Sequence, residues 1–213
     1  MTVKKLYFVN CRGDKMKIIT FVGYTQHLNE LDFDYLVVDK YFNTLTDEQY
    51  RDYKDRIIFH DTNEPNLRLR INKQLRKIIE ILEKEKDDQF AIVDSDLIIP
   101  NLRKISAQNS ILSPCYYALH KGKNYIEPWC FGTNFIFDSK YLNLFKIVIY
   151  SYNDPNESPD GYIHFHLLVN HIIIPKTKHY IKTENGEIEK IITEFDWLET
   201  IKHNFVPVQV INI

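Results

Sequence analysis

Two aspartates stand one residue apart directly after an apolar run in the middle of the chain. The run Phe90–Val93 is followed by Asp94 and Asp96 in the sequence FAIVDSDLIIP. An uninterrupted apolar run of this length is typical of a strand buried on both faces, and in open parallel sheets ligands bind beyond the carboxyl ends of the strands. Paired carboxylates there can hold a divalent cation and, through it, a diphosphate. The alternative is turn formation, because aspartate often hydrogen-bonds nearby backbone where strands end.

The elements before this pair alternate between strands and helices. Strands are expected at residues 6–9, 35–39 and 57–59, and helices from residue 46 onward and at 67–86. Residues 15–31 are ambiguous, because 17–22 is β-branched while the length before the next strand suits a crossover helix, and we favour the helix. Thr46 and Gln49 have the spacing of a capping box, and Ile71, Leu75 and Ile78 belong to the apolar stripe of the last helix. This alternation predicts an α/β fold, with a mostly parallel sheet and helices on both faces.

The second half of the chain has a different pattern. Strands are expected at residues 113–119 and 130–137 as a hairpin or mixed-sheet edge, followed by helices near 139–150, 160–170 and 187–203. In the first half, the carboxyl ends of parallel strands share one rim of the sheet. Asp39, which ends the strand at 35–39, is therefore expected on the same rim as Asp94.

Composition excludes several classes of protein. The chain has 213 residues and a net charge of -2, so it can bury a sizeable core in one domain and has no basic excess for nucleic acid. Its 3 cysteines have no Cys-x-x-Cys spacing, which argues against a disulfide framework or a structural zinc site. No apolar stretch approaches the roughly 20 residues of a membrane span. We expect a cytoplasmic protein, in the host cytoplasm if the chain is viral.

The order of these motifs resembles the nucleotide-sugar glycosyltransferases of the GT-A fold, especially family 2-like enzymes and their small soluble viral and prokaryotic members. Asp94 and Asp96 follow about 90 residues of strand and helix alternation. The segment WCFGTNFIF (residues 129–137) is similar to the family's acceptor and donor-sugar strand, and Glu157–Asp160 lies where the family has its acidic catalytic motif. The resemblance implies one Rossmann-like GT-A domain over residues 1–213, with a nucleotide-binding half (1–100) and an acceptor-binding half (101–213).

The resemblance also implies a metal-dependent donor site for a UDP- or GDP-sugar. We expect Asp96 to contact Mn²⁺ or Mg²⁺, since these cations prefer oxygen ligands, and Asp94 to reach the metal or the ribose. The Ser95 N–H is expected to meet phosphate. The remaining expected contacts come from Asn10 and Asp39 to uracil and ribose, Arg70 to phosphate or base, Asn134 to sugar hydroxyls, and His179 to the metal.

Asp160 is the expected general base, which would take a proton from the hydroxyl of a glycan or protein acceptor and so give inversion at the anomeric carbon. Ser158, Pro159 and Asp160 also read as the start of a helix, where an acidic residue is favoured whatever its function. A nucleotidyltransferase of similar α/β fold is the main alternative, and it would tolerate Asp160→Asn. A non-catalytic scaffold that retains the fold is the third possibility.

Overall fold

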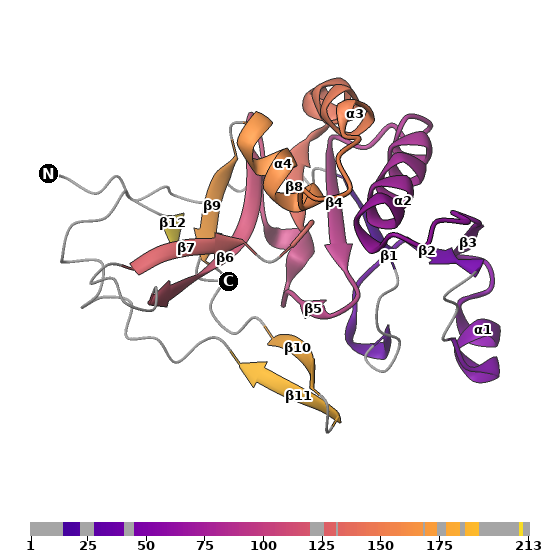
Figure 1. Cartoon of the computed structure of the whole chain (residues 1–213). Coiled ribbons are helices and arrows are strands. Elements are labelled where there is room, and N and C mark those ends of the chain that lie inside the picture. The colour runs from indigo at the N-terminus through magenta and orange to yellow at the C-terminus, as the bar shows by residue number, and fades with distance from the viewer. Residues whose placement is uncertain are drawn as a thin grey trace, which may run out of the picture.

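The computed structural model describes residues 15–21, 28–40, 45–119, 126–130, 132–167, 169–173, 178–183, 186–191 and 209–210. Within these ranges the main sheet has nine strands, in the order β12-β9-β6-β8-β4-β1-β2-β3, with β7 paired to β6 (Figure 1). Their bounds are β1 Met16–Phe21, β2 Tyr35–Asp39, β3 Ile57–His60, β4 Gln89–Asp94, β6 Ile111–Leu119, β7 Ile126–Cys130, β8 Phe135–Asp138, β9 Asn170–Ile173 and β12 Gln209–Val210.

The direction of the strands divides the sheet into two parts. Strands β3, β2, β1 and β4 are all parallel to one another, whereas β8 runs antiparallel to both β4 and β6. A smaller sheet has the order β11-β10-β5, with β5 at Leu97–Ile98, β10 at Lys178–Thr183 and β11 at Gly186–Ile191. The chain thus has the expected α/β class, with a mixed and mostly parallel central sheet flanked by helices.

Strong local signals explain the first two helices. In α1, Asp47–Tyr53, the Thr46 side chain accepts from the Gln49 N–H and the Gln49 side chain accepts from the Thr46 N–H, which confirms the capping box. Helix α2, Leu67–Leu82, starts at Asn66, whose side chain accepts two backbone N–H bonds, and buries the predicted apolar stripe. Helix α3 spans Leu142–Ser151 and α4 spans Pro159–His166. Among the described residues, no helix has the length and apolar character needed to cross a bilayer.

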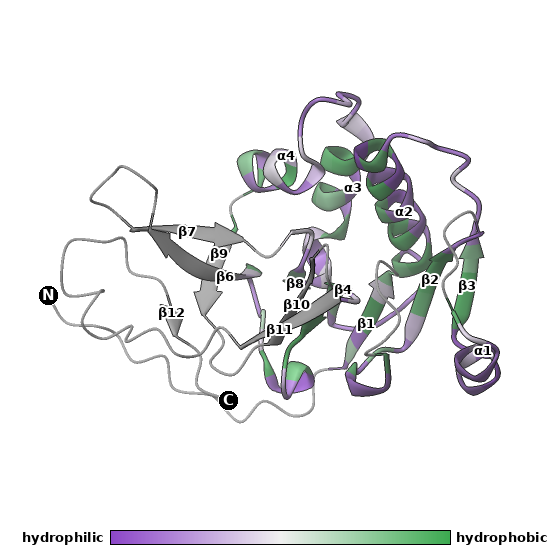
Figure 2. Cartoon of the chain, turned by 60° about the horizontal axis from the view of Figure 1, so that its bottom comes forward, coloured by the Kyte–Doolittle hydropathy of each residue, from purple (hydrophilic) through white to green (hydrophobic). Residues whose placement is uncertain are grey.

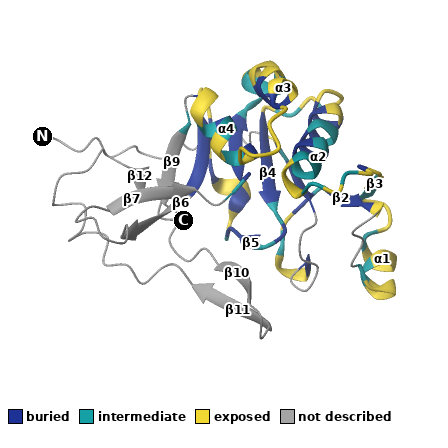
Figure 3. Ribbon diagram, in the orientation of Figure 1, coloured by how far each residue is buried: buried dark blue, intermediate teal, exposed yellow. Residues whose placement is uncertain are grey.

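Side chains of the central strands alternate between two apolar cores, one on each face of the sheet. Ile19, Phe90 and Ile92 pack with the buried face of α2 and with α3, while Ile18 and Ala91 pack in the other core. The central strands are accordingly green along their length in Figure 2 and dark blue in Figure 3. Burial on both faces explains why these strands are continuous apolar runs.

Helices α2, α3 and α4 share one face of the sheet, which we call the helix face. Tyr53 of α1 packs against the opposite core, so helices lie on both faces of the sheet as predicted. Short segments, among them the 3-10 turn Leu28–Glu30, also contribute Leu28, Phe33, Ile99 and Ile105 to that core. Compact turns suffice there because each inserts one or two apolar side chains.

Three predicted elements differ in the structure. Residues 16–21 form the central strand β1 instead of a crossover helix, because the β-branched segment KIITF has no helical periodicity and is buried on both faces. The strand predicted at 130–137 is broken by a turn at Gly132, whose φ is 52°. Residues 186–191 form β11, so the helix predicted at 187–203 is wrong at its start, and the rest of it lies outside the described residues.

The remaining predicted elements fit more closely. The strands at 35–39 and 57–59, the helix at 67–86 and the helix near 139–150 are confirmed within a few residues. The helix predicted at 160–170 ends at His166, because the chain turns into β9. The first predicted strand, 6–9, lies outside the described residues.

Candidate active site

Asp39 and Asp94 lie at the carboxyl ends of two strands that flank β1. Both strands are parallel to β1, so their carboxyl ends share one rim of the sheet. Alternation along each strand also places both aspartates on the helix face, because Val37 and Ile92, two residues before them, belong to the core beneath α2. The expected convergence of the two carboxylates on one rim is therefore present.

The turn before β8 wraps around Asp94. Asn134 Oδ1 accepts from the Asp94 N–H at 2.7 Å, and Asn134 Nδ2 donates to Asp94 Oδ2 at 3.2 Å. The Thr133 hydroxyl donates to the same oxygen at 3.4 Å. A Cβ atom added to Gly132 would lie 2.9 Å from Asp94 Oδ2, so only glycine allows the backbone to approach this closely. These contacts fix the position of the carboxylate.

The electrostatics of Asp94 are unfavourable for a negative charge. Burial of its carboxyl group raises the pKa of Asp94 well above its ordinary value, and the negative charges of Asp96 and Asp160 act in the same direction. Hydrogen bonds from Thr133 oppose the shift without reversing it. The charges of Asp96 and Asp160, from two distant segments, thus both repel a charge on Asp94, and a bound cation would relieve that repulsion.

Asp160 reaches this rim from the start of α4. The helix begins at Ser158 with Pro159 in its first turn, and the Ser158 hydroxyl donates to the Asp160 carboxylate. The side chain of Asp160 is half-buried. The predicted helix start is therefore confirmed, and it coexists with the approach of Asp160 to Asp94 that a catalytic role requires.

Helix α2 holds the segment that leads into α4. Arg68 donates to the carbonyl of Asn156, and Asn72 and Arg76 donate to the carbonyl of Tyr152 at 3.4 and 3.1 Å. Positions 68, 72 and 76 are four residues apart, so they follow one face of the helix. This row of donors anchors the loop that sets the position of Asp160.

Two of the residues expected to contact the nucleotide, Asp39 and Ser95, already make hydrogen bonds within the protein. Asp39 is 2% exposed and accepts a hydrogen bond from the Thr62 hydroxyl. Arg70 is half-buried and lies in the first turn of α2, the helix that follows the carboxyl end of β3 along the chain. The Ser95 N–H donates to the Phe21 carbonyl at 3.2 Å, so it is already paired and could meet phosphate only by giving up that bond.

Asn10 and His179 are the two remaining site residues expected from the sequence. Asn10 lies outside the described residues. His179 lies in β10, where its backbone is in register with Leu97, the residue that follows Asp96. The strand that carries His179 therefore runs beside the Asp-x-Asp segment, as a late-chain metal ligand would require.

Asn134 is 1% exposed, and its side chain makes two hydrogen bonds with Asp94. Its expected contact with sugar hydroxyls stays a prediction. Thr133 and Thr62, which contact the two aspartates, were not identified from the sequence. The glycine in CFGTN was a usable signal for a close backbone approach, whereas a threonine three residues after β3 carries no such signal.

The residues at the rim fit a hard divalent cation only with help from a ligand. Within the described ranges, no three side chains of the His, Cys, Asp or Glu type come together as a complete metal cluster. Asp94 and Asp96 offer carboxylate oxygens, which Mg²⁺ and Mn²⁺ prefer. The phosphate oxygens of a nucleotide would have to supply further ligands, as in sites where Mg²⁺ is bound by one or two carboxylates plus substrate.

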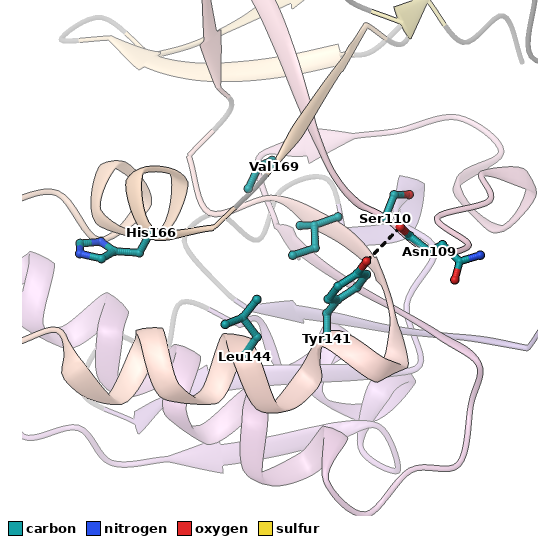
Figure 4. Close-up of a pocket in the computed structure, with 7 residues that line it drawn as sticks. Asn109, Ser110, Tyr141, Leu144, His166 and Val169 are labelled. Carbon is teal, nitrogen blue, oxygen red and sulfur yellow. Dashed lines mark hydrogen bonds between the residues drawn. The ribbon is translucent and has the colours of Figure 1, made fainter.

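A pocket of about 640 Å³ lies at the end of the strands opposite the carboxyl rim (Figure 4). It is lined by Asn109, Ser110, Ile111, Tyr141, Leu144, His166 and Val169. The Tyr141 hydroxyl donates to the Asn109 carbonyl at 3.0 Å and closes one wall. Asn109 bonds Asp138, which pairs with Gln89 at the start of β4, so this pocket is separate from the carboxyl rim.

Comparisons with known proteins give one strong match and several distant ones. No family model matches the chain. Among solved structures, the fold is similar to 4-diphosphocytidyl-2C-methyl-D-erythritol synthase, with 10% identity and a TM-score of 0.45 over 76% of this chain and 90% of that one. It is also similar to a glycosyltransferase involved in the glycosylation of the major capsid of PBCV-1, with 12% identity and a TM-score of 0.35 over 70% of this chain and 74% of that one.

The strong match is to a viral protein. The chain is 44% identical over 192 residues to "Uncharacterized protein 209" of Sulfolobus islandicus rod-shaped virus 1, covering 88% of this chain and 92% of the relative. Identity at this level over nearly the whole of both chains shows common descent and a common fold. The chain therefore belongs to the family of protein 209 of Sulfolobus islandicus rod-shaped virus 1.

Proposed function

We propose that this protein is a metal-dependent glycosyltransferase that moves a sugar from a nucleotide diphosphate to an acceptor hydroxyl. The observation that carries the proposal is the convergence of Asp94, Asp96 and Asp160 at one rim, where the charges of Asp96 and Asp160 both act on Asp94. A buried carboxylate that feels two further negative charges is costly unless a cation or a proton-transfer role compensates for it. Asp39, at the carboxyl end of β2 on the other side of β1, adds a carboxylate at the place proposed for the ribose.

Asp94 and Asp96 would hold Mn²⁺ or Mg²⁺, with His179 as a third ligand from the adjoining strand β10. The cation would act as a Lewis acid that stabilises negative charge on the departing diphosphate. Asn134 and Thr133 would keep Asp94 in place during binding. Arg70 and Asn10 would complete the nucleotide site at the phosphate and the base.

Asp160 would act as the general base. It would accept the proton of the acceptor hydroxyl as that oxygen attacks the anomeric carbon, while the bond from that carbon to the diphosphate oxygen breaks. Attack opposite the leaving group inverts the anomeric configuration. The Ser158 hydroxyl donates to the Asp160 carboxylate and so helps to fix its orientation.

Product analysis tests this proposal against nucleotidyl transfer. UDP- and GDP-sugars with Mn²⁺ should release the nucleoside diphosphate and an inverted product, whereas nucleoside triphosphates with sugar 1-phosphates should release no pyrophosphate. Asp160→Asn should lower transfer by about 10²-fold or more. Asp154→Asn is the matched control, because Asp154 is exposed in the same loop and Asn keeps its acceptor for the Asn156 N–H.

The opposite pattern would replace the proposal. Pyrophosphate release that survives Asp160→Asn would indicate nucleotidyl transfer. Absence of nucleotide binding with either cation would favour a scaffold that retains the fold.

A further inference from the structure

A chain of buried polar groups connects α4 with Asp94 through the sheet. The Ser113 hydroxyl in β6 donates to the Asn134 carbonyl at 2.9 Å and lies 3.4 Å from Nε2 of His164 in α4. Asn134 in turn makes two hydrogen bonds with Asp94. His164, Ser113, Asn134 and Asp94 therefore form one continuous path from the helix to the carboxyl rim.

The direction of each hydrogen bond follows from the groups involved. Ser113 has one hydroxyl proton, and the Asn134 carbonyl is the closer of its two carbonyl contacts, the other being Pro114 at 3.5 Å. With that proton given to Asn134, the Ser113 oxygen can only accept, so Nε2 of His164 must donate. The ring of His164 also packs on Phe135 with centroids 5.0 Å apart, which limits its rotation.

Polar groups are unusual at this place in the molecule. Ser113 is 0% exposed, and Ile111, two residues before it on β6, belongs to the apolar core of the helix face together with Phe135 and Ile163. An apolar pair would fill this space without the cost of burying a hydroxyl and an imidazole. The polar pair instead fixes one rotation and one depth of α4 against β6 and β8, because hydrogen bonds are directional.

His164 and Asp160 lie four residues apart, about one turn of α4, and so share one side of the helix. Any rotation or slide of α4 that moves Asp160 would also stretch the contact between His164 and Ser113. We propose that His164 is a positioning residue that, through Ser113 and Asn134, sets the distance between the carboxylates of Asp160 and Asp94. This inference rests on the proposed function, in which Asp160 is the base and Asp94 belongs to the donor site.

Two substitutions separate the hydrogen bond from the ring packing. His164→Gln keeps an N–H near the place of Nε2 and loses the ring, whereas His164→Phe keeps a ring against Phe135 and loses the donor. His166→Gln is the control, because His166 is exposed and its Nδ1 lies 2.8 Å from the Tyr162 carbonyl on its own helix. All three variants should fold, since none removes an apolar core residue.

The kinetic measurement is the steady-state rate of sugar transfer from the nucleotide-sugar donor in the presence of Mn²⁺. His164→Phe should lower kcat roughly tenfold while the KM for the donor stays within about twofold, because the base is misplaced and the donor site is intact. His164→Gln should retain most of kcat, and His166→Gln should match the unmodified protein. The inference would be overturned if kcat of His164→Phe equalled that of the unmodified protein. It would also be overturned if His164→Gln lost as much of kcat as His164→Phe.

An NMR measurement on the protein without ligands separates this inference from the proposed function. The Asn134 side-chain amide and Asp94 backbone amide signals should shift in His164→Phe and stay in place in His164→Gln and His166→Gln. Unshifted signals in His164→Phe would overturn the inference even if the enzyme is active. Shifted signals in a protein without transferase activity would leave the link intact and overturn the proposed function instead.

Discussion

Asn134 holds Asp94 from two directions, accepting from its backbone N–H at 2.7 Å and donating to its carboxylate at 3.2 Å. The two residues are 40 positions apart in sequence, and both are set by strand β8 running antiparallel to β4. The aspartate whose burial disfavours its charge is thereby held by hydrogen bonds from both Asn134 and Thr133.

Asn134→Ala should destabilise the fold and loosen the site together. The substitution leaves the Asp94 N–H and one carboxylate oxygen without these bonds, which costs about 1–3 kcal/mol for a buried group. Urea denaturation gives the free energy of unfolding. A loss well below 1 kcal/mol would mean that the pair contributes little to holding Asp94.

Asp94→Asn should raise stability while it abolishes function. A carboxyl group with a raised pKa in the folded state makes its full contribution to stability below its ordinary pKa, and this contribution is lost as the pH rises from there through the raised pKa. Above its ordinary pKa the Asp94 carboxyl group is therefore destabilising, and a neutral isostere removes both the cost of burying its charge and the repulsion from Asp96 and Asp160. The midpoint of thermal unfolding should rise, and an unchanged or lower midpoint would contradict this reading of the site.

Gly132→Ala should perturb Asp94 directly. Its φ of 52° strains alanine, and the added Cβ would lie 2.9 Å from Asp94 Oδ2, for a cost of about 1–3 kcal/mol. Gly161→Ala is the matched control, because the nearest atom to its Cβ is Ser158 Cβ at 3.8 Å and the residue lies inside α4. The control should gain about 0.5–1 kcal/mol. Equal effects in the two variants would refute the close approach at Gly132.

His60 should make stability depend on pH in the mildly acidic range. Burial and then the charge of Lys77 lower the pKa of His60, and its Nε2 is buried without a hydrogen-bond partner in the described structure. The unfolded chain therefore takes up this proton first as the pH falls through the ordinary histidine range, which lowers the free energy of unfolding. Between pH 7 and pH 5 the decrease should be smaller in His60→Gln. If the free energy of unfolding fell by the same amount in both proteins over this pH range, His60 would make no contribution to the pH dependence.

The sequence could predict the rim because it depends on local signals. The apolar run before Asp94 and the run before Asp39 each specify a buried strand, and parallel pairing brings their ends together without further information. The capping box at Thr46 and the stripe of α2 are likewise short-range patterns. Such patterns can be read from a single sequence because a few neighbouring residues determine each of them.

The rest of the site depends on contacts between distant segments. The strand at 16–21 was mistaken for a helix because a β-branched run is ambiguous until it is known to be buried on both faces. The contacts of Asn134 with Asp94, and of Arg68 with the Asn156 carbonyl, join residues 40 and 88 positions apart. No local pattern encodes these pairs, so the row of donors on α2 and the path through Ser113 became visible only in three dimensions.

The central claim is that Asp94 and Asp96 bind a nucleotide diphosphate through a divalent cation. Titration calorimetry with UDP and GDP, with Mn²⁺ and with chelator, tests it most directly. Asp88→Asn is the control, since Asp88 is an exposed aspartate at the opposite end of β4. We predict binding that requires the cation, persists in Asp88→Asn and is lost in Asp96→Asn. Binding of equal affinity in chelator, or in Asp96→Asn, would contradict the claim.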